Sequence, residues 1–518
     1  MKAGISLALA LTAAAAFAQG TSAGPTGTGR VDAPVLRRLK QLGIESASLC
    51  SDSVFVRRAY LDVIGTLPTA GEVTSFLGDT RPNKRSALID LLLEREEFSV
   101  YWAMKLSDLL RIKAEFPINL WPNAAQAYYV WLRTSLEENK PYDRFARELL
   151  TSSGSNFRVA PVNFYRAAES KDPNALAKAV ALAFLGARAD KWKPGRLRGM
   201  ARFFTHVAFK PTQEWKEEVV YFDTIRARKD AAVKPLTAFC PDGTRVKLSP
   251  TRDPRLAFTD WLIAPKNPWF ARCMVNRIWC WLMGRGIVHE PDDFRPDNPP
   301  SHPELLDLLA AELTAERYDL KHVYRLILNS KTYQRSCVAA SNHPDAEAHF
   351  AHYAVRRLEA EVLIDAICQI TGTTESYSSR IPEPFTWIPE HHRTIALPDG
   401  SITSSFLDLF GRPPRDTGLH AERSNKPSAA QRLHLLNSSH ILGKMNRSRR
   451  LGKLMRITGG DLRPPATRLY LTILSRLPTE DELKVVEAYS RGEETKGQKA
   501  LTDLAWALVN SSEFQYRH

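Results

Sequence analysis

Residues 60–69, with the sequence YLDVIGTLPT, set the type of fold, and a close copy, YLTILSRLPT, occurs at residues 470–479. The residue before a proline avoids helical backbone angles, and a threonine side chain can accept a hydrogen bond from a free N–H of the next helix. A glutamate follows three residues after each threonine, at Glu72 and Glu482, and completes a capping box. The repeat therefore predicts a duplicated helical corner, one near each end of the sequence.

Apolar residues spaced three and four apart predict helices along most of the chain. The clearest segments are Val54–Ile64, Arg85–Leu93, Ala124–Leu136, Ala175–Leu185, Leu305–Leu313 and Leu320–Leu328. Residues 301–304, SHPE, predict a further capping box. Strand signals are few, and Glu218–Phe222 with Thr244–Leu248 predict one small β-ribbon. We expect a mainly α protein with two helical domains, residues 31–205 and 251–518, joined by a linker with short strands at 206–250.

The first residues carry the signs of an export signal. Lys2 precedes the apolar run Ile5–Phe17, and residues 16–18, AFA, match a small-residue cleavage site. This arrangement predicts a signal peptide at residues 1–18, cleaved near Ala18, with a membrane anchor as the alternative. Residues 19–30 are rich in Gly, Ser and Thr and predict a flexible leader. We expect a soluble periplasmic or secreted protein without a transmembrane span in the mature chain.

Composition gives broad limits on function. Of 518 residues, 44% are hydrophobic and 25% charged, which is typical of a globular protein and excludes a disordered or multi-span membrane chain. Lysine and arginine number 71 against 57 acidic residues, a formal charge of +14 that favours anionic partners. The basic residues are dispersed and the protein is expected outside the cytoplasm, so nucleic acid is not an expected partner.

The six cysteines contain no C-x-x-C pair and no C-x-x-C-H motif. This excludes covalent c-type haem and the usual cysteine zinc sites, and no cofactor is expected. Cys273 and Cys280 would lie about 10.5 Å apart along a helix, which is too far for a disulfide between them. We interpret the cysteines as buried small hydrophobes, with at most one or two long-range bridges.

Acidic residues gather in the loop at 289–297, HEPDDFRPD. Asp292 and Asp293, with His302 nearby, are weak candidates for a metal site, because carboxylate oxygens suit calcium or magnesium and a histidine admits a transition metal. The alternative is that the two aspartates form ion pairs with Arg277, Arg285 or Arg295 and tie the loop onto the helices.

Two other groups could bind a ligand. Arginine side chains can grip a carboxylate or sulfate through two parallel hydrogen bonds, and the group considered is Arg412, Arg415 and Arg423. The alternative is internal pairing with Asp408, Asp416 or Glu422. Four tryptophans crowd one segment, at positions 261, 269, 279 and 281. Such rings can recognise sugars, but at helical spacing they belong more often to a core.

A run of motifs carries a family resemblance. It comprises DPR at 253–255, DWL at 260–262, NPWFAR at 267–272, VNRIW at 275–279, GRGIV at 284–288, DDF at 292–294, PSHPELL at 300–306, FGRPPR at 410–415 and the pair ER at 422–423. Together they resemble the PSD-type domain of unknown function found in secreted, cytochrome-c-associated paralogues of planctomycetes. Residues 57–65 and 184–186 resemble its PSCyt-type partner domain. The motifs add Asn276, Arg277, Arg285 and Glu422 to the ligand-binding candidates.

The sequence departs from that family at the positions that would hold iron. Family members usually follow Phe-Leu-Gly with C-x-x-C-H-x-H-P, whereas residues 187–192 here read ARADKW. The family also commonly has a cysteine shortly before the Glu-Arg pair, where this chain reads GLHA at 418–421, and no separate cytochrome domain is present in the sequence. The redox role that the resemblance implies therefore lacks its ligands in this chain.

No motif names a reaction, since neither G-x-S-x-G nor G-x-x-x-x-G-K-[ST] occurs. We favour a non-catalytic exported protein that binds or scaffolds a protein partner or an anionic glycan. One alternative is a metal-assisted hydrolase centred on Asp292, Asp293 and His302. The other is a haem-free accessory of a periplasmic redox complex.

Overall fold

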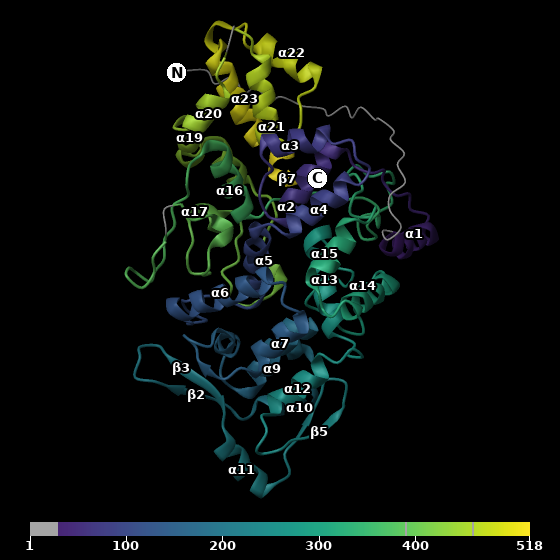
Figure 1. Ribbon diagram of the computed structural model, residues 1–518, viewed down its shortest axis with the longest axis vertical. Helices are drawn as coiled ribbons and strands as arrows, with labels where there is room; N and C mark the ends of the chain where they lie inside the picture. Colours follow the sequence, from purple (N-terminus) through teal and green to yellow (C-terminus); the bar gives the residue numbers. More distant parts are fainter. Residues whose placement is uncertain (1–28, 389–390, 458–459) are drawn as a thin grey trace.

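Helices form most of the structure, as the apolar spacing predicts, and the strands are short (Figure 1). The computed structural model describes residues 29–388, 391–457 and 460–518. The predicted signal peptide at 1–18 and all but the last two residues of the predicted leader lie outside the described residues.

The N-terminal half, residues 29–205, contains ten helices: α1 (Gly29–Leu42), α2 (Asp52–Val63), α3 (Ala70–Gly78), α4 (Lys84–Leu93), α5 (Glu96–Leu109), α6 (Pro122–Glu137), α7 (Tyr142–Thr151), α8 (Asn163–Arg166), α9 (Pro173–Val180) and α10 (Pro194–Ala201). The predicted helix at 175–185 changes character near its end. Its last turn, Ala181–Leu185, is a wider π-helical turn that stops at Gly186, whose φ is 60°.

The C-terminal half contains thirteen helices among its described residues: α12 (Pro254–Leu262), α13 (Phe270–Met283), α14 (Pro303–Ala315), α15 (Leu320–Leu328), α16 (Ala360–Thr371), α17 (Ser405–Leu409), α18 (Ala429–Asn437), α19 (Ser439–Asn446), α20 (Arg449–Leu454), α21 (Arg463–Ile473), α22 (Glu480–Tyr489), α23 (Gln498–Asn510) and α24 (Ser512–Gln515). The two copies of the repeat meet in space, because α21 packs against α3.

Two of the three predicted capping boxes are confirmed. Thr69 with Glu72 caps α3, and Thr479 with Glu482 caps α22. The box predicted at 301–304 is wrong, because α14 begins after His302 and has no side-chain cap. The Ser301 hydroxyl instead donates to the carbonyl of Ile287, 3.1 Å away, so the competing hydrogen bond to the preceding loop prevails.

The predicted strands both form, but they do not pair with each other. β3 (Glu218–Phe222) lies between β1 (Gly154–Ser155) and β2 (Val207–Pro211), and β5 (Arg245–Lys247) pairs with β4 (Thr237–Phe239), all antiparallel. A helix, α11 (Thr224–Val233), lies between the two ribbons. β2 is close to β3 in the sequence and β4 is close to β5, so each predicted strand forms a local hairpin on its own side of α11.

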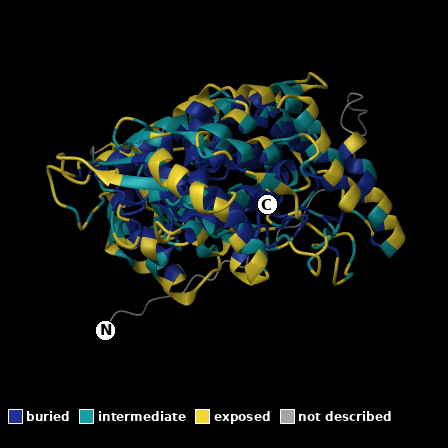
Figure 2. Cartoon of the chain, turned by 90° about the horizontal axis from the view of Figure 1, so that it is seen from below, coloured by how far each residue is buried: buried dark blue, intermediate teal, exposed yellow. Residues whose placement is uncertain are grey.

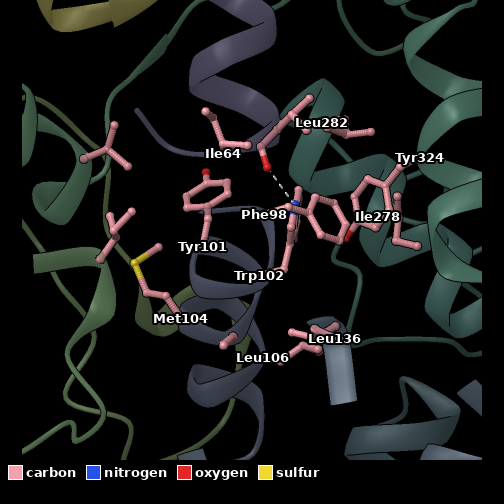
Figure 3. Close-up of a cluster of buried hydrophobic side chains, with 14 of the residues drawn as sticks. Ile64, Phe98, Tyr101, Trp102, Met104, Leu106, Leu136, Ile278, Leu282 and Tyr324 are labelled. Atoms are coloured by element: carbon pink, nitrogen blue, oxygen red, sulfur yellow. Dashed lines mark hydrogen bonds between the residues drawn. The ribbon is translucent and has the colours of Figure 1, made fainter. Parts of the chain in front are cut away.

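Helix α5 is the centre of the hydrophobic core, and residues 98–107 on it are all buried. The indole N–H of Trp102 donates to the carbonyl of Val63 at 3.0 Å, and its ring packs 4.5 Å from that of Tyr324 (Figure 3). Trp102 belongs to the N-terminal half and Tyr324 to the C-terminal half. Buried residues continue through the interior of both halves, with exposed residues on the outer helical faces (Figure 2).

The end of the chain returns to the N-terminal helices (Figure 1). Strand β7 (Tyr516–Arg517) pairs with β6 (Arg356–Arg357). From α2, the guanidinium of Arg57 donates to the carbonyls of Ile473 and Phe514, each at 2.8 Å. The two halves are thus joined by buried hydrogen bonds as well as by one continuous core.

Candidate functional site

A small crevice of about 30 Å³, lined by several charged side chains, lies where α5, α13 and the segment 413–423 meet. Its ionisable lining residues are Lys105, Asp108, Arg277, Asp292, His420 and Arg423. Three of these, Arg277, Asp292 and Arg423, are residues that the sequence predicted. The structure therefore brings part of the predicted set together at one place.

Arg277 and Asp292 form a buried ion pair, with Nη2 and Oδ1 separated by 3.0 Å. Arg277 also donates to the carbonyls of Leu182 and Ala183 in the π-helical turn, and the other carboxylate oxygen of Asp292 accepts the backbone N–H of His420 at 2.6 Å. The pair ties the acidic loop to three separate segments. This is the loop-tying arrangement that the sequence left as the alternative to a metal site.

Arg423 lies between two carboxylates, 2.8 Å from Asp108 and 2.7 Å from Glu361. Burial alone would raise the pKa of Glu361, but the guanidinium groups of Arg423 and Arg412 together outweigh burial and hold that pKa at about 2. Arg415 reaches the second oxygen of Asp108 at 3.0 Å, and Arg412 approaches Glu361 at 3.5 Å. The predicted arginine group is internally paired, but with acids far away in the sequence.

The pairing that the sequence considered for these arginines, with Asp408, Asp416 or Glu422, is wrong. Glu422 accepts backbone N–H groups of residues 416 and 417 and so closes a turn, and Asp416 pairs with Lys113. Asp408 accepts the hydroxyl of Thr403. These acids are close to the arginines in the sequence but do not pair with them, because the turns of the segment direct the guanidinium groups inward toward α5 and α16.

Lys105 is another buried cation of the crevice and pairs with Glu359. Burial lowers the pKa of Lys105 to about 8, because Glu359 offsets only part of the desolvation. Glu359 in turn binds Arg517 at 2.5 Å, and Arg517 binds Asp62 at 3.1 Å. One buried charge network therefore runs from the crevice to the C-terminal strand.

His420 is the only ionisable lining residue of the crevice that forms no ion pair with another described residue. Its Nε2 lies 3.8 Å from the thiol of Cys280. Burial lowers the pKa of His420, so its imidazole is neutral at physiological pH. Burial also raises the pKa of the Cys280 thiol to about 12, so the pair holds no thiolate.

Two of the other predicted residues, Asn276 and Asp293, have structural partners outside the crevice. The Asn276 amide donates to the carbonyl of Val288 at 3.0 Å and accepts its N–H at 2.9 Å. Asp293 pairs with Arg295 at 3.2 Å and Lys191 at 3.5 Å. Arg285 forms no ion pair with any described residue.

The structure does not bring together the three predicted metal ligands. Asp292 and Asp293 have separate ion-pair partners, and the ring of His302 packs 5.2 Å from those of His349 and Phe350. Across the described ranges, no three His, Cys, Asp or Glu side chains are grouped so that they could hold a metal ion. All six cysteines are free thiols, so Cys273 and Cys280 are not bonded to each other, as predicted.

Sequence reasoning missed Lys105, Asp108, Glu359 and Glu361. One signal was available, because Lys105 and Asp108 interrupt α5, a segment rich in aromatic and aliphatic residues. Charged residues on a buried helix need partners of opposite charge. The sequence alone could not say which partners, since they come from the other half of the chain.

With this geometry in view, the family of the chain can be stated. Residues 30–190 match PSCyt2, a protein family of unknown function (DUF1549), and residues 254–490 match PSD1, a protein family of unknown function (DUF1553). The chain belongs to the proteins that carry a PSCyt2 domain followed by a PSD1 domain. The resemblance drawn from the sequence motifs is thereby confirmed. No curated protein and no solved structure matches the chain.

None of the helices in the described part of the chain has the length and apolar character needed to cross a membrane.

Proposed function

We propose that this protein is exported and acts as a non-catalytic binding protein or scaffold, with an anionic glycan or a protein as its partner. The observation that carries the proposal is the pairing inside the crevice. Its two arginines, its lysine and its two aspartates each bind an opposite charge of the same chain. Groups committed in this way stabilise the packing of the two halves and are not free to move protons or to bind a reacting oxyanion.

Export is supported by the sequence pattern of residues 1–18, and an anionic partner by the charge of +14. The metal-assisted hydrolase has less support, because Asp292, Asp293 and His302 have separate partners. Among the contacts of the described residues, none favours the redox accessory over the binding protein.

Affinity electrophoresis and an assay for new reducing ends test the proposal together. Purified protein is run through gels that contain polygalacturonate or dextran sulfate, with dextran as the uncharged control. We expect retardation by an acidic polymer and no release of reducing ends. Release of reducing ends that is lost in His420→Ala would overturn the proposal, because His420 is the ionisable lining residue of the crevice that forms no ion pair with another described residue. Absence of retardation by either acidic polymer would remove the glycan as partner.

A further inference from the structure

Five aromatic side chains lie on three segments that are distant in the sequence but in contact in the structure, and we call them the aromatic patch. Four of them are largely exposed: Phe116 by 79%, Trp215 by 67%, Phe385 by 51% and Trp387 by 72%. The fifth, Trp121, is half-buried. Single exposed apolar residues are normal on a protein surface, but a group of large aromatic rings marks an interaction site. None of these residues belongs to the charged crevice.

Measured contacts hold the three segments together. The rings of Trp121 and Phe385 lie 5.4 Å apart between centroids. The ammonium of Lys216, on the turn between β2 and β3, lies 5.8 Å from the ring centroid of Trp121 and 5.3 Å from that of Trp215. The N–H of Arg380 donates to the Glu115 carboxylate at 2.9 Å, which places the segment of Phe385 beside that of Phe116. The β2–β3 hairpin lies at the edge of the molecule (Figure 1).

The backbone of the patch is strained and firmly held. Asn119, Trp121 and Lys216 have φ angles of 59°, 73° and 63°, a region that residues with bulky side chains rarely adopt. The N–H of Trp121 donates to the carbonyl of Ala114 at 3.2 Å, and that of Glu115 donates to the Ser401 hydroxyl at 2.9 Å. Strained positions that the surrounding structure fixes are concentrated at ligand-binding sites, where they hold side chains ready for contact.

The chemistry of the patch fits a polymer with apolar faces and negative charges. Flat aromatic rings offer stacking surfaces to the C–H faces of sugar rings, and their area is large for little conformational freedom. Lys216 forms no ion pair with another described residue, so its ammonium between two indole rings is available to a carboxylate or sulfate. The exposed Glu214 and Glu383 would have to be dehydrated at a bilayer, whereas a hydrated polymer leaves them in water.

We propose that the aromatic patch binds an acidic polysaccharide, with sugar rings stacked on Trp121, Trp215 and Phe385 and a carboxylate or sulfate on Lys216. This inference rests on the proposed function and names both the ligand class and the place where it binds. Two of the four tryptophans crowded into one segment of the sequence pack in or against the core, as their helical spacing predicts. Trp279 is fully buried, and Trp281 packs against Trp102 in the core.

Trp215→Ala and Lys216→Ala test the patch in the same gels, since both side chains are exposed and their loss leaves the core intact. We expect the dissociation constant for polygalacturonate or dextran sulfate to rise about three- to tenfold in Trp215→Ala and about threefold in Lys216→Ala. Lys216→Arg should bind as the unaltered protein does. Phe239→Ala removes an aromatic ring, 38% exposed, from the other ribbon and is the matched control.

The outcomes separate the two proposals. Retardation of the unaltered protein that neither Trp215→Ala nor Lys216→Ala weakens would overturn the assignment to the patch and leave the glycan-binding function standing. No retardation of the unaltered protein by either acidic polymer would remove both the glycan-binding function and the assignment to the patch. Equal retardation by dextran would overturn the acidic ligand. Sedimentation with phosphatidylcholine–phosphatidylglycerol vesicles that requires Trp215, without retardation by either polymer, would make the patch a membrane contact.

Discussion

Glu361 shows how strongly one residue can depend on its neighbours, because a carboxylate with no exposed surface lies between Arg412 and Arg423. Glu361→Gln leaves both arginines buried with less negative charge, and breaking a buried pair in this way costs about 3 kcal/mol of unfolding free energy at pH 7. The measurement is urea unfolding followed by circular dichroism. Glu304→Gln, at an exposed pair with Arg37, is the control and should be indistinguishable from the unaltered protein.

The effect of Glu361→Gln also has a defined pH dependence. The pKa of Glu361 is about 2 in the folded protein, below its ordinary 4.5. The charged carboxylate therefore contributes stability above pH 4.5, and this contribution is lost as the pH falls from 4.5 toward 2. The stability difference between the two proteins should be constant above pH 5 and shrink below pH 4. A difference that stays constant down to pH 3 would contradict the ion-pair account.

His302 should destabilise the fold in mild acid. Burial and the neighbouring charges of His349 and Arg38 lower its pKa from 6.5 to about 3. Between these values the unfolded chain binds a proton that the folded protein does not, so stability falls as the pH drops below 6.5. Relative to His302→Gln, the unaltered protein should lose about 2 kcal/mol between pH 7.5 and pH 5. The check is the urea midpoint at both pH values, with His391→Gln at an exposed position as the control.

At the scale of single elements, the two confirmed capping boxes should contribute alike. Thr69→Ala and Thr479→Ala each remove a hydroxyl that accepts a helix N–H at 3.2 Å, and each should cost about 1 kcal/mol of unfolding free energy. Ser301→Ala is the informative comparison, because Ser301 does not cap α14. Circular dichroism should show no loss of helix in Ser301→Ala. A loss of helical signal as large as that in Thr69→Ala would mean that Ser301 caps α14.

The elements that the sequence predicted are those defined by local signals. The predicted segment 54–64 is α2, at Asp52–Val63, because apolar spacing and the Ser51 cap both lie within a few residues. The sequence could not show which strands β3 and β5 would pair with. Both segments have similar strand character, and the register of a strand depends on its partner. The ion-pair partners of Arg423 and Lys105 could not be predicted either, because they lie about 60 and 250 positions away in the sequence.

At the scale of the whole molecule, charges from each half neutralise charges of the other. Asp62, Lys105 and Asp108 belong to the N-terminal half, and their partners Arg517, Glu359 and Arg423 belong to the C-terminal half. These groups are buried, so separating the halves would leave them without partners on newly exposed apolar surfaces. Because these buried ion pairs join the halves, the two family matches in one chain do not imply two units that fold independently.

This arrangement predicts that residues 29–253 and 254–518, produced separately, will not unfold cooperatively. Each lacks part of the shared core around Trp102 and the counter-charges of its partner. Co-production should give a complex that elutes with the intact chain and shows one thermal transition. A control chain with a protease site in the exposed turn at 242–244, cut after folding, should remain one particle. A cooperative transition in residues 254–518 alone would show that the PSD1 domain does not need its PSCyt2 partner to fold.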